Sequence, residues 1–355
     1  MKSDVLFSII VVNYNGKRYV DRCVESIFRS RAADFEVIVC DNGSTDGSAD
    51  WLEEKFGKDL DRLKVVRLRE NLGPAAARNM GAHIARGRYL GFLDNDTEVH
   101  PDWAGNAMRE FENDPALGII QCKLLLLKER NKIDYVGEYL GQNGFLVQRS
   151  SAGEVDVGQY DQKVDILAAK SAGMFIRRDV FERIGGFDDD YFIYVEETDL
   201  GWRSWLAGFK ARFVPDSIVF HEFGTSTIIL GKNQNNYNAK FHGTKNYILT
   251  LLKNLEFGNA LKIIPRHVLL WAGLAWFSLA KGDWRAFGWI HLAIGWNVRN
   301  ARRTMRKRWL IQECRVLNDK ALFRAFMRKM PMSYFVRKAT RRQKVGNAEG
   351  FVKSS

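Results

Sequence analysis

The stretch YLGFLDND, residues 89–96, joins a short apolar run to two carboxylates at its end. Its first five residues have the length and composition of a buried strand. Similar runs precede it at 7–12, 36–40 and 64–68, and helical patterns lie between the runs at 17–30, 46–56 and 74–86. Strands that alternate with helices predict an α/β fold, with a mostly parallel, Rossmann-like sheet and helices on both faces.

Polar residues follow these runs: Asn13 after the first, Asp41 after the second, and Asp94 and Asp96 after the fourth. Ligands of open parallel sheets bind outside the carboxyl ends of the strands, so we expect these side chains to share one edge. Asp94 and Asp96 are candidate ligands of a divalent cation, because Mg²⁺ commonly uses one or two carboxylates together with substrate phosphates. Acidic turns also follow strands without any ligand, and this alternative stays open.

Two further residues near this edge have a functional and a structural interpretation. Asp41 either accepts a hydrogen bond from a ribose hydroxyl or a base N–H, or belongs to a strand-to-helix turn in which Asp46 is the N-cap. Arg78, on the helix expected at 74–86, either neutralises phosphate or is an ordinary surface residue.

A later block, residues 163–220, carries a second acidic cluster. It predicts a strand at 164–176, a short helix at 178–184 and an acidic helix start at 196–199. Glu196 and Glu197 could be partly buried behind an aromatic segment and act as general bases. Alternatively, they form an acidic first helical turn, with Asp199 and Arg203 as an ion pair. His221 is either an ordinary strand-end histidine or a ligand beside the carboxylates.

Composition limits the class of protein. The 355 residues are enough for about two domains, and 46% apolar with 27% charged residues is ordinary globular composition. The four cysteines are far apart, so neither a disulfide framework nor a zinc site is expected, and a reducing cytoplasm fits best. The first apolar run is too short for a signal peptide, so we expect no export. The glycine-containing stretch 141–159 is expected to be a mobile loop.

Positive charge is concentrated near the C-terminus. The net charge is +12, and residues 299–345 hold sixteen Lys/Arg against two acids, a net of +14, while residues 346–355 add zero; the first 298 residues therefore carry 12 − 14 = −2. The folded domain of a nucleic-acid-binding protein would be basic over its surface. A nucleic-acid-binding function is therefore suggested only by the basic segment.

Two tryptophan-bearing apolar segments, 268–280 and 288–296, precede the basic segment. The longer has 13 residues, short of the roughly 20 that a spanning helix needs. We expect an interfacial membrane anchor, since tryptophan and basic residues suit the headgroup region of anionic lipid. The alternative is a helical hairpin that packs on the catalytic domain.

The order of the motifs SIIVVNYNG, CDNGSTDGS, NLGPAAARNMG, FLDND, GGFDDDYFIYVEETDLGWR and VFHEFGTS, over residues 6–226, closely resembles glycosyltransferase family 2. The similar members include bacterial rhamnosyl- and galactosyltransferase-like proteins. The resemblance implies a GT-A fold and an inverting, metal-dependent transfer of rhamnose or a hexose from a nucleotide diphosphate sugar. It implies a catalytic domain at 1–226 and a helical, membrane-associating basic region at 227–355.

The resemblance also implies roles for individual residues. The base of the family is usually the second acid of a Glu-Asp pair; that position is Glu197, one methylene longer, so the choice between Glu197 and Glu196 stays open. The other implied roles are nucleoside binding by Asn13 and Asp41, contact with the diphosphate or sugar by Arg78 and Asn79, contact with the nucleotide or donor sugar by Asp94, and binding of Mg²⁺ or Mn²⁺ by Asp96 and His221.

The resemblance implies partners as well. The expected acceptor is a hydroxyl of a glycan or polyprenyl-linked molecule in bacterial surface polysaccharide synthesis, without nucleic acid. The expected location is cytoplasmic, peripheral on the inner face of the cell membrane through the C-terminal segment. A sugar nucleotidyltransferase is the nearest enzymatic alternative. A dinucleotide-dependent oxidoreductase is not indicated, because Asn13-Tyr14-Asn15-Gly16 is not the GxGxxG that should follow the first strand.

Overall fold

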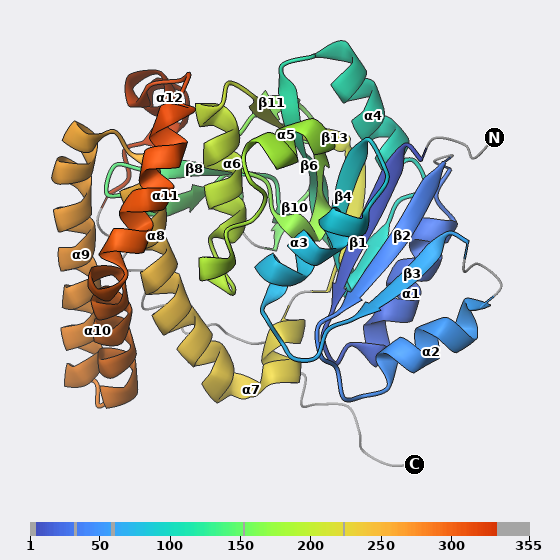
Figure 1. The fold of residues 1–355 in the computed structure, drawn as a ribbon, viewed down its shortest axis with the longest axis horizontal. Coiled ribbons are helices and arrows are strands. Elements are labelled where there is room, and N and C mark those ends of the chain that lie inside the picture. Colours follow the sequence, from blue (N-terminus) through green and yellow to red (C-terminus); the bar gives the residue numbers. More distant parts are fainter. Residues whose placement is uncertain (1–4, 32–33, 58–60, 152, 223, 332–355) are drawn as a thin grey trace.

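A large mixed sheet, covered by helices, is joined to a layer of helices from the last third of the chain (Figure 1). The structure is a computed structural model. It describes residues 5–31, 34–57, 61–151, 153–222 and 224–331. Residues 332–345 of the basic segment lie outside the described residues.

The strands and helices have the following bounds. The strands are β1 (Phe7–Asn13), β2 (Phe35–Asp41), β3 (Leu63–Arg67), β4 (Tyr89–Asp94), β5 (Thr97–Val99), β6 (Leu117–Leu126), β7 (Lys132–Tyr135), β8 (Glu138–Gly141), β9 (Leu146–Gln148), β10 (Glu154–Val155), β11 (Val164–Asp165), β12 (Met174–Arg177), β13 (Lys210–His221) and β14 (Met327–Arg328). The α-helices are α1 (Lys17–Phe28), α2 (Ser48–Lys55), α3 (Pro74–Ile84), α4 (Trp103–Asn113), α5 (Arg178–Arg183), α6 (Glu196–Leu206), α7 (Thr225–Tyr237), α8 (Gly243–Asn254), α9 (Phe257–Ala280), α10 (Trp284–Arg299), α11 (Ala301–Glu313) and α12 (Asp319–Phe326). Short helical turns are η2 (Ser171–Gly173), η3 (Asp189–Tyr191) and η4 (Asn238–His242).

The first four strands form the predicted parallel part of the sheet, in the order β3-β2-β1-β4. β1 and β2 are almost fully buried, as their continuous apolar runs predict for a sheet with both faces covered. The register pairs Asn13 with Asp41 and Val12 with Asp94, so the polar residues leave the sheet at one edge. Beyond β4 the pairing is largely antiparallel, because β12 lies antiparallel between β4 and β6.

Helices cover both faces of the sheet, as predicted. On one face α1, α2 and α4 contribute to the core, and α1 does so through Val20, Val24 and Ile27, which recur at helical spacing. On the other face the core includes residues of α3, α5 and α6. The sheet is therefore fixed from both sides, which holds its carboxyl edge in place.

The strand predicted at 164–176 is wrong, because the chain leaves the sheet between β11 and β12. It passes under α6 so closely that a Cβ on Gly201 would lie 2.5 Å from the Ala168 side chain. It then turns through η2 before rejoining the sheet. Packing against a helix that is distant in sequence, which local propensity does not encode, breaks the strand.

The mobile loop predicted at 141–159 is also corrected, because much of it is ordered in strands. β9 pairs with β8, and β14 adds to β8 from the C-terminal region. Leu146 and Val147 are buried. The glycines mark turns within this small sheet, as Gly144 does with its φ of +81°.

The C-terminal region is helical, as predicted, and packs on the sheet domain. A hydrophobic cluster joins Trp202 and Leu206 of α6 to Leu251, Leu255 and residues further along the chain, so it crosses position 226. α9 is one helix of 24 residues that continues through Pro265. The helix extends beyond the predicted apolar run of 13 residues, and by length and composition alone it could cross a membrane.

Candidate active site

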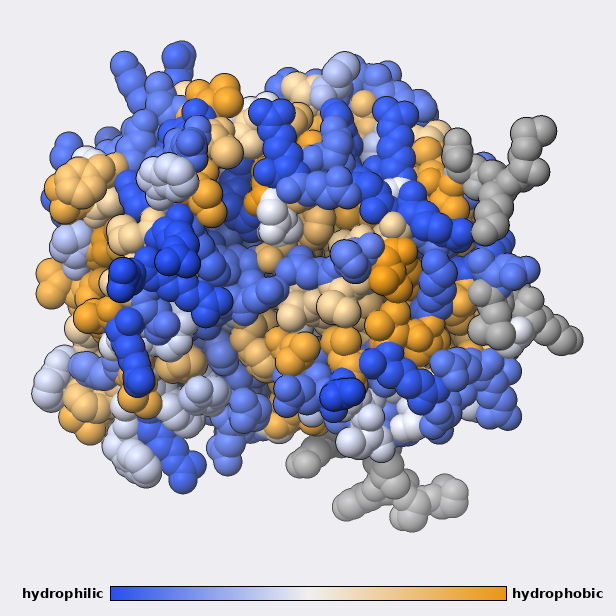
Figure 2. Space-filling model, in the orientation of Figure 1, coloured by the Kyte–Doolittle hydropathy of each residue, from blue (hydrophilic) through white to orange (hydrophobic). Residues whose placement is uncertain are grey.

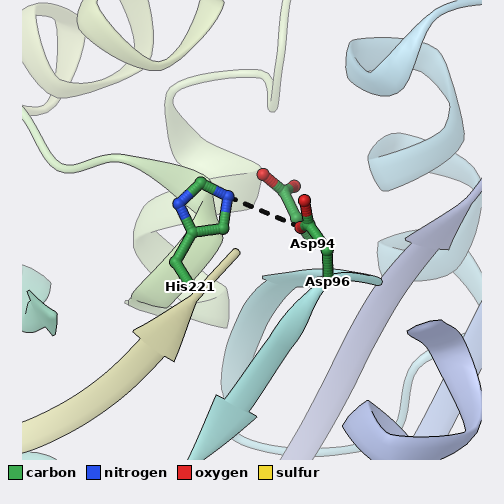
Figure 3. A group of neighbouring side chains, drawn as sticks. All are labelled: Asp94, Asp96 and His221. Atoms are coloured by element: carbon green, nitrogen blue, oxygen red, sulfur yellow. Dashed lines mark ion pairs between the residues drawn. The ribbon is translucent and has the colours of Figure 1, made fainter. Parts of the chain in front are cut away.

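Asp94, Asp96 and His221 meet at the carboxyl edge of the sheet (Figure 3). One ligand atom from each lies within 4.8 Å of the others, and His221 Nε2 is 3.5 Å from Asp96 Oδ1. The contact arises because β13 pairs with β5, which sets His221 opposite Thr97, the residue after Asp96. Two carboxylates and one imidazole form a donor set that fits a divalent cation and leaves coordination positions for substrate oxygens.

The other ring nitrogen of His221 is held by a second carboxylate. His221 Nδ1 donates to Asp134 Oδ2 at 2.9 Å, and Lys170 Nζ lies 3.4 Å from the same oxygen. This arrangement directs Nε2 toward Asp96, as outer carboxylates do for metal-binding histidines. Burial disfavours the charged imidazole, but Asp96 and Asp134 raise the pKa of His221 to about 10. Asp134 is also buried, yet Lys170 and His221 lower its pKa.

Arg78 connects this cluster to α6. Its guanidinium is buried and donates from Nη2 to Asp94 Oδ1 at 2.9 Å and from Nη1 to Glu196 Oε1 at 3.0 Å. Burial alone would lower the pKa of Arg78, but the charges of Asp94 and Glu196 raise it. The surface alternative for Arg78 is therefore wrong, and Arg78 is a charged group between the two acidic motifs.

Glu196 and Glu197 are adjacent in sequence but lie in different environments. Glu196 is buried against Arg78, and burial together with the neighbouring Glu197 raises its pKa to about 8. Glu197 is only partly buried, and its Oε1 accepts hydrogen bonds from the Ser171 backbone N–H at 2.9 Å and from the Ser171 hydroxyl. Among the described residues nothing is hydrogen-bonded to Glu197 Oε2, so this oxygen can accept a proton.

Glu197 and the acidic cluster belong to one site. Ser171, which holds Glu197, follows Lys170, which pairs with Asp134 behind His221. Burial disfavours the Lys170 charge, but Asp134, Glu197 and Asp94 raise its pKa. The lysine is therefore within electrostatic range of both acidic groups, and the two groups are not on remote surfaces.

Asn13 and Asp41, for which nucleoside binding was expected, lie together at the carboxyl edge of the sheet and are bonded to each other. Asn13 is fully buried, and its side chain bonds to Asp41 at 3.1 Å, Ser48 at 2.8 Å and Asn95 at 2.7 Å. It therefore positions Asp41 instead of presenting a free group to a ligand. Asp46 accepts from the Ser48 backbone N–H at 3.0 Å, which supports the predicted turn before α2, although Gly47 is the N-cap.

Asn79 does not join the cluster. Its Nδ2 donates to the Phe187 carbonyl and to Asp189 Oδ1, each at 2.8 Å, and its Oδ1 accepts from the Phe187 N–H. The side chain thus fixes the segment before α6, and its contact with diphosphate or sugar stays a prediction. The predicted ion pair of Asp199 with Arg203 is present at 2.8 Å.

The sequence interpretation missed Asp134, Lys170 and Ser171. One signal was available for Asp134, a lone acid between the apolar residues Ile133 and Tyr135 in a strand-like run. No local pattern marks the other two. A cavity of about 550 Å³ lies between α5, α6 and α11, but none of the predicted site residues lines it.

Comparison with known proteins supports the same organisation. Residues 8–185 match the model of the family described as glycosyl transferase family 2. Over 115 residues the chain is 33% identical to chondroitin synthase of Pasteurella multocida (strain Pm70), an alignment that covers 32% of this chain and 12% of that protein. The chain thus spans about an eighth of the length of this curated relative.

Solved structures of the GT-A fold have the same architecture. The structure of GalNAc-T7 with UDP, GalNAc and Mn²⁺ has a TM-score of 0.58 at 18% identity, and the match covers 71% of this chain and 48% of that one. A mannosyltransferase from Pyrobaculum calidifontis, in complex with GDP-Man and Mn²⁺, has a TM-score of 0.52 at 16% identity over 87% of this chain and 85% of that one. At such identities the likeness establishes the fold alone.

Proposed function

The chain belongs to glycosyl transferase family 2, and from this membership we propose that it transfers a sugar, rhamnose or a hexose, from a nucleotide diphosphate sugar. The acceptor is a hydroxyl group of a glycan or polyprenyl-linked molecule in bacterial surface polysaccharide synthesis. The observation that carries the proposal is the meeting of Asp94, Asp96 and His221 at the sheet edge, with Arg78 bonded both to Asp94 and to Glu196, the neighbour of Glu197 at the start of α6.

Each residue then has a chemical task. Asp96 and His221, with Asp94 beside them, would hold Mg²⁺ or Mn²⁺, which stabilises negative charge on the departing diphosphate. The acceptor oxygen bonds to the anomeric carbon while the bond to the diphosphate breaks, which inverts the configuration. Glu197 Oε2 takes the proton of the acceptor hydroxyl, and Ser171 keeps the carboxylate oriented. Asp41 faces the nucleoside.

Glu197 is the better candidate base of the two glutamates. Each glutamate has one oxygen without a hydrogen-bond partner among the described residues, but that of Glu196 is buried behind its bond to Arg78, whereas Glu197 is partly exposed. Glu196 instead holds Arg78 beside Asp94. Two proteins of the same fold were solved with nucleotides and Mn²⁺, which supports a cation and a nucleotide sugar as ligands.

The test is a thermal-shift screen of UDP-, GDP- and dTDP-sugars with and without Mn²⁺. An assay that measures release of the nucleoside diphosphate and formation of the glycosylated acceptor follows. A ligand that binds the folded state raises its apparent stability. We expect one donor to stabilise the chain only when Mn²⁺ is present, and Asp96→Ala to abolish both this stabilisation and transfer. The matched control is Asp216→Ala, an exposed aspartate on β13.

Two results would reject the proposal. One is synthesis of a nucleotide sugar from a nucleoside triphosphate and a sugar phosphate, which would identify a nucleotidyltransferase. The other is an Asp96→Ala chain that keeps full activity and is indifferent to metal.

A further inference from the structure

Large apolar side chains are exposed along the outer faces of α9 and α10. Six of them are between 60% and 71% exposed: Phe257, Leu261, Leu269, Trp276, Trp284 and Leu292. We call this set, with the turn 281–283, the hairpin face. Figure 2 shows apolar side chains interspersed with polar ones over this edge of the molecule, at the left. So many large apolar side chains exposed on one helical hairpin are typical of a docking surface.

The hairpin face is basic as well as apolar. Residues 257–299, which form α9, the turn and α10, contain five Lys/Arg and one acid, Asp283. That acid caps α10 by accepting from the Ala286 N–H at 3.0 Å. Lys281 and Arg285 flank the turn, stand over the rings of Phe277 and Trp284, and have no acidic partner among the described residues. Positive charge combined with tryptophan is the chemistry that binds the headgroup region of anionic lipid.

The inner side of α9 is fixed to the protein. His267 is fully buried, its Nδ1 donates to the Asn143 carbonyl at 2.9 Å, and its Nε2 accepts from Trp271 Nε1 at 2.9 Å. Lys262 and Arg266 lie on the exposed side of the same helix. A spanning α9 would break the inner hydrogen bonds and place two charges in hydrocarbon, which is costly. The geometry therefore favours a helix that lies on a bilayer over one that crosses it.

Three of the ten Lys/Arg at 300–331 form ion pairs with acidic residues of the protein. Lys307 of α11 pairs with Asp188 and Asp190, and Arg303 pairs with Asp190 at 2.6 Å. Arg315 pairs with Asp319 at 3.0 Å. The described part of the basic segment therefore contributes to folding, and the free charges at the hairpin turn are the better candidates for lipid contact.

The hairpin turn and the candidate active site face the same side of the molecule. In Figure 1 the turn between α9 and α10, the carboxyl ends of β1 and β4, and α7 all lie toward the lower edge. α7 follows His221 closely and exposes Ile228. A bilayer that contacts the hairpin turn would therefore lie on the side of the molecule toward which the carboxyl edge of the sheet points.

We propose that the hairpin face docks on an anionic lipid bilayer and turns the active site toward it. This inference rests on the proposed function in one respect: the docked orientation delivers a lipid-linked acceptor hydroxyl to Glu197. The docking itself depends only on the surface chemistry of α9 and α10.

The test is flotation of the full chain with vesicles of phosphatidylcholine alone or mixed with phosphatidylglycerol. The docking variant carries Trp276→Ser, Trp284→Ser, Lys281→Glu and Arg285→Glu. We expect the parent chain to bind the anionic vesicles and the docking variant to bind them about tenfold or more weakly, because both apolar and electrostatic contacts are lost. A salt wash should release the parent chain.

The control variant carries Val155→Ser, Val157→Ser, Arg88→Glu and Arg183→Glu, exposed positions outside the hairpin, and should float like the parent. The thermal unfolding temperature of the docking variant and its sugar transfer to a water-soluble acceptor should match those of the parent. These two measurements distinguish a failure of docking from a failure of the proposed function. Equal flotation by parent and docking variant would overturn the inference. So would resistance of the bound chain to salt and alkaline extraction, which indicates a spanning helix, or a dimer in solution that the docking substitutions dissociate while the parent does not bind vesicles.

Discussion

Two buried histidines show how differently the sheet edge and the helical layer are built. His221, at the sheet edge, lies between Asp96 and Asp134, and these carboxylates raise its pKa to about 10 despite burial. His267, in α9, has only a backbone carbonyl and a tryptophan N–H as partners, and burial lowers its pKa to about 4. Neighbouring carboxylates thus favour the charged imidazole in one region, where a bound cation would take the place of that proton, and burial favours the neutral imidazole in the other.

The charged sheet edge is suited to ligand binding, whereas the helical layer mainly stabilises the fold. The sheet edge brings together the carboxylates Asp94 and Asp96, which a cation can bind, and the guanidinium of Arg78, which a diphosphate can contact. Glu197, at the start of α6, keeps one oxygen without a hydrogen-bond partner among the described residues. The helical layer is held together by apolar contacts, hydrogen bonds and ion pairs, such as that of Lys307 with Asp188. Substitutions at the sheet edge should therefore change binding and turnover, and substitutions in the helical layer should change the free energy of unfolding.

The largest effect is expected at the proposed base. Glu197→Gln keeps the shape and the hydrogen bonds from Ser171 but cannot take a proton, so turnover should fall by roughly 10³-fold. Donor binding and the unfolding temperature should stay close to the parent values. The measurements are steady-state transfer, donor titration and thermal unfolding. Unchanged turnover would assign the proton transfer to another group.

The next effect tests the helical layer through pH. His267 is neutral in the folded chain and titrates near 6.5 when unfolded, so the unfolded state binds more protons as pH falls from about 6.5 to about 4. Its contribution to stability is complete above that window and is lost within it, by up to about 3 kcal/mol. Urea unfolding at a series of pH values measures the loss. His267→Gln should flatten this pH slope.

A smaller effect is expected from the carboxylate behind His221. Asp134→Asn weakens the bond that orients the imidazole, so Mn²⁺ affinity should fall by about 10- to 100-fold. Calorimetric titration of the folded chain measures this affinity without any turnover. Asp161→Asn is a suitable control, because Asp161 is an exposed acid that pairs with Lys123. Equal Mn²⁺ affinity in parent and Asp134→Asn would remove Asp134 from the cation site.

The smallest effect should come from the link between the two regions. Lys307→Met removes the ammonium that pairs α11 with Asp188 and Asp190. Lys307 is partly exposed, so the expected loss of unfolding free energy is about 1 kcal/mol, with little change in turnover per folded molecule. Chemical denaturation of the two chains gives the difference. A change in turnover larger than the change in stability would show that α11 also positions α6.

The sequence determined the local features of this protein. Alternating apolar runs and helical patterns specified the parallel strands β1 to β4, because backbone hydrogen bonding and the burial of one helix face depend on neighbouring residues. The same runs placed Asp41, Asp94 and Asp96 at one edge, since parallel strands end on the same side. The sequence also predicted the acidic start of α6 and the apolar character of α9 and α10.

Only the tertiary structure decided which groups meet. His221 and Asp134 are 87 residues apart, Arg78 and Glu196 are 118 apart, and Ser171 and Glu197 are 26 apart. These contacts depend on the pairing of β13 with β5 and β6 and on the chain leaving the sheet under α6. No local propensity encodes such pairings, because their free energy comes from packing between distant segments. For the same reason the different environments of Glu196 and Glu197, and the outward face of α9, appear only in the folded chain.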